Sequence, residues 1–223
     1  MSAGLRLRLA TEADAPGLLA IYGPVVRDTA ISFELDGPSL EEMRTRVRTT
    51  LEQWPWLVAE DVAPARSGPP LLGYAYAGPF RARPAYRWTV ETTVYVHAEC
   101  QRRGVGFALY TALLEILRAA GYRNVIGGIT LPNPSSVALH ERLGFRHVGT
   151  FPAAGFKLGC WHDVGFWRVD LRGGEPPPTP PRPLPSLVTT PEWHTALRTG
   201  ERHLRENAPA GSPPLPEKPE PKA

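Results

Sequence analysis

Cysteines, long apolar runs and an excess of one charge are all scarce in this sequence, and each absence narrows the class of protein. Of the 223 residues two are cysteines, Cys100 and Cys160, and no Cys-x-x-Cys pair occurs. A disulfide framework and a cysteine-held metal are therefore disfavoured, and we expect no metal. No apolar run approaches the roughly 18 residues that a membrane span requires. The first ten residues alternate leucine with arginine rather than forming the apolar segment of a signal peptide, which favours a cytoplasmic location.

The charge balance points to a small anionic ligand more than to nucleic acid. The formal net charge is +3, and the arginines are dispersed along the chain. Nucleic-acid-binding proteins usually concentrate basic residues on one element, so we expect neither a nucleic-acid nor a membrane partner. The length of 223 residues suits one domain of ordinary size plus an extension, and the 42% of hydrophobic residues suits a globular protein with a core.

The spacing of apolar residues predicts an α/β fold with a mixed sheet. Thr11 with Asp14, and Ser39 with Glu42, have the spacing of capping boxes at helix starts. Asn133 followed by Pro134 marks a third helix start. A fourth helix, ending before Gly121, follows a glycine-containing turn at 101–106. Strands are expected over 5–9, 56–60, 71–77, 87–96, 125–129, 147–151 and 162–171, with loops over 61–70 and 152–161.

The composition changes at Gly173, so we place a domain over 1–172 and an extension over 173–223. The extension holds 14 of the 26 prolines. Such a composition buries little apolar surface, which predicts a flexible segment. A helix over Pro191–Arg205 is an alternative, although Gly200 would interrupt it.

The turn Gln101–Gly106 has the composition of a phosphate cradle. Gly104 and Gly106 lack Cβ atoms that would keep a ligand from the backbone, and Arg102 and Arg103 add positive charge. The free N–H groups of the following helix N-terminus attract phosphate. The turn lacks both the G-x-G-x-x-G pattern and the Gly-Lys-Ser/Thr ending of nucleotide-binding loops.

Two side chains are candidates for chemistry. Glu91 lies among Trp, Val, Thr and Tyr in an expected strand, where it is either a surface ion-pair partner or a general base with a raised pKa. It shares one face of that strand with Thr89, Thr93 and Tyr95. His140, on the helix after Asn133, is either a packed side chain or a proton donor.

Four segments resemble the phosphinothricin N-acetyltransferase family of the GNAT superfamily. They are YAGPFRARPAYRWTVETTVYV, QRRGVG, LPNPSSVALHERLGF and AAGFKLGCWHDVGFWRVDL, and the similarity runs from about Leu7 to about Pro185. The resemblance implies the GNAT acyltransferase fold, a mixed and mostly antiparallel sheet flanked by helices. It also implies a cytoplasmic, generally dimeric enzyme that uses acetyl-CoA to acetylate the α-amino group of phosphinothricin and related amino acids.

The resemblance assigns roles residue by residue. Glu91 would be the base, with His140 beside it. The amino-acid pocket would be lined by Phe33, Arg83 and Tyr86. The cofactor would be held by Val94, Tyr95, Val96, Arg102, Arg103, Gly104, Val105, Gly106, Phe107 and Asn133. The 80–87 loop departs from the family pattern at Phe80, Arg81, Pro84 and Arg87.

The resulting hypothesis is direct acetyl transfer to an amine deprotonated by Glu91. A strand amide near Tyr95–Val96 would stabilise the oxyanion, and His140 or solvent would protonate the leaving thiolate. Two alternatives remain: a different acceptor, such as methionine sulfoximine, methionine sulfone or another small amine, and a non-catalytic acyl-CoA-binding protein on the same fold.

Overall fold

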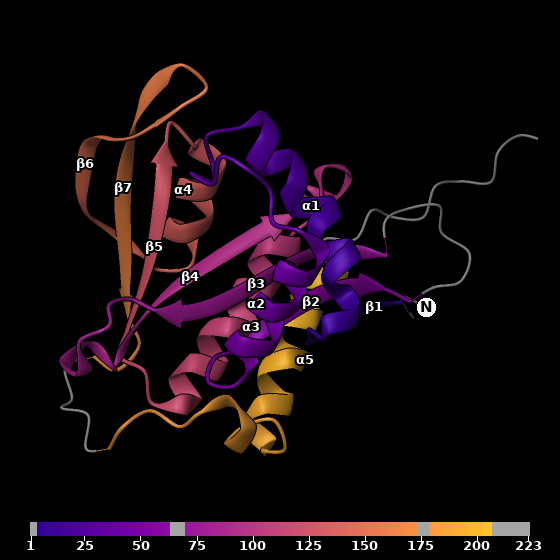
Figure 1. The fold of residues 1–223 in the computed structure, drawn as a ribbon. Coiled ribbons are helices and arrows are strands. Elements are labelled where there is room, and N and C mark those ends of the chain that lie inside the picture. The colour runs from indigo at the N-terminus through magenta and orange to yellow at the C-terminus, as the bar shows by residue number, and fades with distance from the viewer. Residues whose placement is uncertain (1–3, 63–69, 174–178, 207–223) are drawn as a thin grey trace, which may run out of the picture.

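A seven-stranded mixed sheet organises the chain (Figure 1). The computed structural model describes residues 4–62, 70–173 and 179–206. The strand order is β1-β2-β3-β4-β5-β7-β6. The strands are β1 (Leu5–Leu9), β2 (Trp56–Asp61), β3 (Leu71–Pro79), β4 (Thr89–Val96), β5 (Asn124–Leu131), β6 (Arg146–Lys157) and β7 (Cys160–Asp170). The β4–β5 pair is parallel and the other neighbouring pairs are antiparallel, which confirms the expected mixed and mostly antiparallel sheet.

Helices cover both faces of the sheet and enclose two hydrophobic cores (Figure 1). The α1 (Ala15–Asp28) and α2 (Leu40–Leu51) helices pack on one face, where Leu18, Val47 and Tyr74 are buried. The other face carries α3 (Val105–Ala120), α4 (Pro134–Arg142) and α5 (Pro191–Glu206). Within the described residues, no helix is both long and apolar enough to span a membrane.

The helix starts predicted at Ser39 and Asn133 are confirmed by their hydrogen bonds, whereas Thr11 opens a 3-10 turn (Glu12–Asp14) that leads into α1. At Ser39 the side chain accepts from the Glu42 N–H while the Glu42 carboxylate accepts from the Ser39 N–H, which is a complete capping box. The Asn133 side chain caps α4 by accepting from the Ser136 N–H. Gly121 ends α3 at φ 98°, a left-handed conformation that glycine adopts without strain.

The predicted loop over 152–161 is wrong, because β6 and β7 continue through it as a long hairpin. Leu158 (φ 51°) and Gly159 (φ 77°) form a two-residue turn between the paired Lys157 and Cys160. A register shift between Phe151 and Gly155 accommodates the irregular residues of β6. Because β6 is the edge strand, its Pro152 breaks no internal ladder. The loop expected over 61–70 falls largely on residues 63–69, which lie outside the described residues.

The flexible extension predicted from residue 173 onward is contradicted for 179–206. The helix α5 packs against α3 and β1, and the buried side chains of this segment join the main core: Leu184, Leu187, Trp193, Ala196 and Leu204. Gly200 does not interrupt the helix. A Cβ there would lie 2.6 Å from the Ala108 carbonyl oxygen, so glycine allows α5 to approach α3 closely. The boundary at 172/173 stays a prediction, and 207–223 lie outside the described residues.

Candidate active site

The two central parallel strands separate beside Glu91. Their register begins at Thr89 opposite Asn124 and ends at Glu91 opposite Ile126, although β4 continues to Val96 and β5 to Leu131. Beyond this point β4 still pairs with β3, and β5 still pairs with β7. The facing edges of the two strands therefore leave backbone groups available to an extended ligand, as at any unpaired strand edge.

A cavity of about 90 Å³ occupies this fork and reaches both faces of the sheet. Ser136 and His140 of α4 line it together with Asn133, which caps that helix, whereas Ile31 lines it from the loop between α1 and α2. Thr92 to Tyr95 and Gly128 to Thr130 provide its strand walls. The cavity is thus a slot through the sheet, and two molecules can meet in it from opposite sides.

The backbone N–H and C=O groups of every second β4 residue point into the slot. The Trp88 carbonyl accepts from the N–H groups of Arg123 and Asn124 on the β5 side, whereas the His97 N–H donates to Leu72 on the β3 side. Strand alternation then directs the polar groups of Val94 and Val96 into the gap. Those of Tyr95 face β3. Of the three predicted backbone contacts, the geometry favours Val94 and Val96.

The turn before α3 has the backbone of an anion-binding nest. Arg102 has φ 60° and Gly104 has φ 76°, with Arg103 between them outside the positive-φ region, so the conformation alternates. Such alternation turns consecutive N–H groups to one side. The first bond of α3 runs from Ala108 N–H to the Gly104 carbonyl, so the N–H groups of Val105, Gly106 and Phe107 precede the helical ladder.

Gly106 lies close to side chains of α4 and β4. A Cβ at this position would lie 3.2 Å from Leu139 Cδ2, 3.5 Å from Val96 Cγ2 and 3.9 Å from Val94 Cγ2. The turn therefore lies directly beside the β4 edge of the slot. A cofactor lying along Val94 and Val96 reaches the nest without leaving this surface.

The Glu91 side chain lies at the fork with an altered acidity. A Cβ on Gly128, a residue that lines the slot, would lie 3.2 Å from Glu91 Oε1. Burial raises the pKa of Glu91, and the positive charge of Arg81 offsets part of that rise. A carboxylate with a raised pKa is a stronger base than an exposed one, as general-base catalysis requires.

His140 is held as a neutral, buried ring. Its Nδ1 lies 2.7 Å from the Ser136 carbonyl oxygen, which requires a proton on Nδ1, and Nε2 lies 3.3 Å from the Tyr110 hydroxyl. Burial lowers the pKa of His140, which also favours the neutral ring. Nε2 is therefore an acceptor for Tyr110 in this arrangement.

The expectation that His140 lies beside Glu91 is wrong. A Cβ on Gly127 would lie 2.5 Å from His140 Nε2, whereas the Cβ position of Gly128 meets Glu91. Consecutive strand residues face opposite sides of a sheet, so the two side chains lie on opposite faces of β5. Sequence spacing could not show this, because it depends on how β4 and β5 separate.

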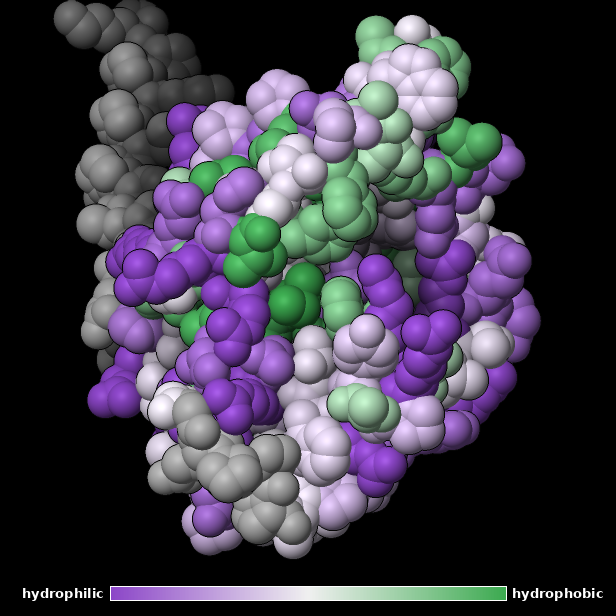
Figure 2. Space-filling model, turned by 90° about the vertical axis from the view of Figure 1, so that its left-hand side faces the viewer, coloured by the Kyte–Doolittle hydropathy of each residue, from purple (hydrophilic) through white to green (hydrophobic). Residues whose placement is uncertain are grey.

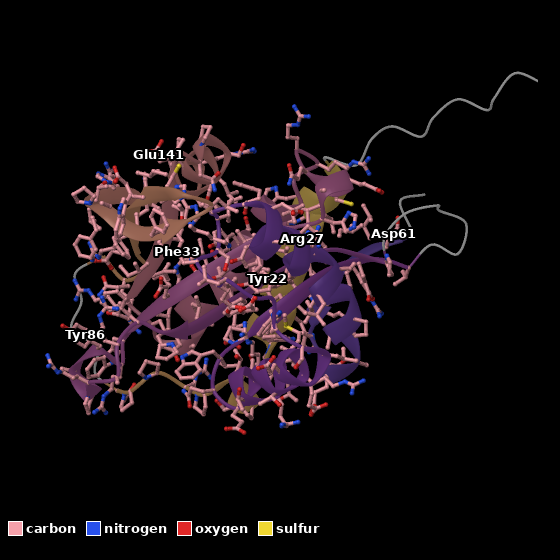
Figure 3. All side chains as sticks on the ribbon, turned by 45° about the horizontal axis from the view of Figure 1, so that its top comes forward. Tyr22, Arg27, Phe33, Asp61, Tyr86 and Glu141 are labelled. Carbon is pink, nitrogen blue, oxygen red and sulfur yellow. The ribbon has the colours of Figure 1, made fainter. Side chains whose placement is uncertain are left out.

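The three predicted acceptor residues do not share one cavity. Phe33 packs against Gly155 and lies 6.3 Å, ring to ring, from His162. Tyr86 and Arg83 lie in the exposed 80–88 loop, and Figure 3 shows Tyr86 well apart from Phe33. Tyr86 instead lines a cavity of about 410 Å³ together with Arg81, Arg87, Trp54, Tyr122 and other residues. Neither Glu91 nor the slot borders that cavity.

An aromatic cavity that the sequence does not predict lies on the Glu91 face of the sheet. It has a volume of about 220 Å³ and its lining includes Tyr22, Arg46, Trp56, Tyr74, Tyr76 and Tyr95. Tyr76 pairs in register with Thr93, two residues from Glu91 on the same face. Arg46 is ion-paired with Glu34 at 2.7 Å. The strand pattern in the sequence places Tyr95 on the Glu91 face and so indicates an aromatic side chain there. Tyr22 joins the cavity only through tertiary packing, which the sequence does not show.

A central sheet opened between parallel strands, beside a glycine-containing nest at a helix N-terminus, defines the GNAT class of acetyltransferases. The sequence matches the acetyltransferase (GNAT) domain family over residues 7–165. It is 42% identical over 180 residues to the phosphinothricin N-acetyltransferase of Streptomyces viridochromogenes, covering 81% of this chain and 93% of that protein. It is 37% identical to an L-methionine sulfoximine/L-methionine sulfone acetyltransferase of Pseudomonas aeruginosa, covering 74% and 94%.

The solved structures agree with these sequence matches. A GNAT superfamily phosphinothricin acetyltransferase from Sinorhizobium meliloti, in complex with acetyl-CoA, superposes with a TM-score of 0.74 at 35% identity. The match covers 84% of this chain and all of that one. The chain belongs to the phosphinothricin N-acetyltransferase family of the GNAT superfamily. It is by class an acetyl-CoA-dependent N-acetyltransferase.

Proposed function

We propose that this protein transfers the acetyl group of acetyl-CoA to the α-amino group of phosphinothricin or a similar methionine-like amino acid. The observation that carries the proposal is the fork between β4 and β5: the Glu91 carboxylate lies beside Gly128, and Gly128 lines the slot. Relatives named for phosphinothricin and for methionine sulfoximine support this acceptor class.

The cofactor would enter on the face that carries α3 and α4. Its diphosphate would sit on the nest from Arg102 to Phe107, where free N–H groups and two exposed arginines favour anions. The pantetheine would follow the edge at Val94 and Val96. Asn133 lines the slot opposite this edge, which supports its predicted contact with the cofactor.

The acceptor would enter on the face that carries α1 and α2. Its ammonium would lie near Glu91, and its side chain would lie between Phe33 and the tyrosine-lined cavity. The arginines of the 80–88 loop suit the acceptor's carboxylate. Arg81 lies near enough to affect the pKa of Glu91, and Arg83 and Tyr86 stand in the same loop.

The chemistry is a direct attack of the amine on the thioester carbonyl. Glu91 would take the ammonium proton, because only the free amine is a nucleophile. The oxyanion would receive a hydrogen bond from the backbone N–H of Val94 or Val96. The thiolate would leave and gain a proton from solvent.

A homodimer formed through the edge hairpin is part of the proposal. Figure 2 looks onto the side where β6 and β7 lie, and apolar residues gather in the upper part of that face. Large exposed apolar side chains occur on both strands and their turn: Val148, Phe151, Phe156, Leu158 and Trp161. Such a set on an edge strand is typical of a protein–protein interface. Trp161→Glu should then convert dimers to monomers in light scattering; a chain that is monomeric without the substitution contradicts the dimer.

The acceptor is tested by measuring thiol release from acetyl-CoA. Phosphinothricin, methionine sulfoximine, methionine sulfone and unsubstituted methionine would be compared at matched concentrations. Turnover with the first three, and with phosphinothricin the best, supports the proposal. Preference for the sulfoximine or sulfone would assign the alternative acceptor. Acetyl-CoA binding without turnover on any amino acid would instead assign a non-catalytic binding protein. Cytoplasmic location stays a prediction.

A further inference from the structure

The side chain of Phe107 is held by two elements that lie outside its own helix. Phe107 is the third residue of α3 and provides the last N–H group ahead of the helical ladder. The Arg142 guanidinium, at the end of α4, lies 4.1 Å from the centre of its ring. The His203 ring of α5 meets it edge-on, with centroids 5.0 Å apart and an interplanar angle of 82°.

The position of His203 follows from how α5 docks. At Gly200 the backbone of α5 touches α3, because a Cβ there would lie 2.5 Å from Leu7 Cδ1 and 2.6 Å from the Ala108 oxygen. The next residue, Glu201, accepts from the Leu7 N–H at 3.1 Å. One helical turn beyond Gly200, His203 faces Phe107, which precedes Ala108. Because α5 is fixed here, the Phe107 contact is part of a packed interface.

The contact lies at the mouth of the proposed cofactor site. The N–H groups of Val105, Gly106 and Phe107 precede the helical ladder, so the orientation of the first turn of α3 sets the geometry of the anion contacts. Preorganised donors bind an anion more tightly than mobile ones, because less order must be imposed on binding. The matched GNAT domain ends at residue 165, before α5 begins.

We infer that α5 is a structural wall of the acetyl-CoA site and that His203 is a positioning residue that holds Phe107 in the cradle. The inference rests on the proposed cofactor position. Its consequence is specific: loss of the His203 ring weakens acetyl-CoA binding and leaves the acceptor site, on the other face of the sheet, unchanged. Loss of one aromatic contact corresponds to roughly a two- to tenfold change in affinity.

The test compares four variants of the full chain by calorimetric titration with acetyl-CoA and by steady-state kinetics. His203→Ala removes the ring, and His203→Phe retains an aromatic contact. His194→Ala is the matched control, because His194 is exposed on the same helix away from the cradle. Arg103→Glu reverses a charge at the nest itself.

The expected result is a two- to tenfold higher Kd and KM for acetyl-CoA in His203→Ala. His203→Phe should restore the parent values, and His194→Ala should match the parent. The acceptor KM and the kcat at saturating acetyl-CoA should stay constant. If Arg103→Glu weakens binding while His203→Ala does not, the cradle is correct and the role of α5 is refuted. A parallel rise in both KM values, with a lower melting temperature, would show general destabilisation and also refute it. If neither variant changes acetyl-CoA binding, the proposed cofactor position itself fails.

Discussion

Replacement of Glu91 by glutamine separates the contribution of this carboxylate to catalysis from its effect on folding stability. Glutamine keeps the size of the side chain and its contact near Gly128, but it cannot accept the ammonium proton. Positioned general bases contribute about 10²- to 10⁴-fold to rates. We therefore expect kcat to fall by that factor, which corresponds to about 2.7–5.4 kcal/mol in activation free energy.

The free energy of unfolding of Glu91→Gln should rise at neutral pH, although its kcat falls. Burial raises the pKa of Glu91 in the folded chain, with Arg81 offsetting part of the rise, so the folded state binds the proton more tightly than the unfolded state. Stability is therefore full below the unfolded-state pKa of about 4.3 and falls as pH rises from there through the raised pKa, because the unfolded carboxyl ionises more readily than the folded one. Glu91→Gln removes this cost. The variant should be at least as stable as the parent at neutral pH, and the difference should disappear in acid.

The assay is thiol release as a function of pH, together with thermal unfolding. The parent should lose kcat/KM on the acidic side, with a midpoint above the ordinary glutamate value of about 4.3. That acidic limb should be absent from the residual activity of Glu91→Gln. Acetyl-CoA affinity should not change. Turnover within tenfold of the parent, or an acidic limb that persists in the variant, would refute the assignment of Glu91 as the base.

Three further substitutions test other parts of the structure. Lys157→Met removes a buried ammonium that donates to the Val26 and Ser32 carbonyls at 2.6 Å. Chemical denaturation should show that the free energy of unfolding falls by about 2–5 kcal/mol. A smaller fall would show that water replaces the ammonium. Trp193→Ala should cost about 3–5 kcal/mol because the side chain is 5% exposed within the core, whereas a flexible extension would lose almost nothing. His140→Gln should lower kcat by less than tenfold, since the neutral ring is an acceptor for Tyr110; a loss above a hundredfold would restore His140 as the acid.

Local signals were sufficient to predict most of the fold. Ser39 with Glu42, and Asn133 with Pro134, carry their helix starts in adjacent side chains, and the structure confirms both. The alternation around Glu91 assigned the two faces of β4 because a strand repeats every two residues. Pro152 and Gly155 are typical of a loop and therefore hide the long hairpin, although an edge strand with a register shift accepts them.

In the extension, composition and periodicity predict different structures, and the periodicity agrees with the structure. Trp193, Ala196, Gly200 and Leu204 recur at spacings of three and four, which places them on one side of a helix. Their burial against α3 then stabilises a helix that its own composition does not favour. The tyrosine-lined cavity could not be found in this way, since Tyr22 and Tyr76 meet only after α1 folds onto the sheet.

The opening between β4 and β5 has a kinetic consequence. Since the thioester and the amino acid would enter from opposite faces of the sheet, the binding of one would not require the other to be bound or released first. We expect initial-rate patterns in which either substrate adds first, and product inhibition in which free thiol competes with acetyl-CoA but not with the amine. The sheet would then separate the two substrates except at the slot, where the reacting atoms meet.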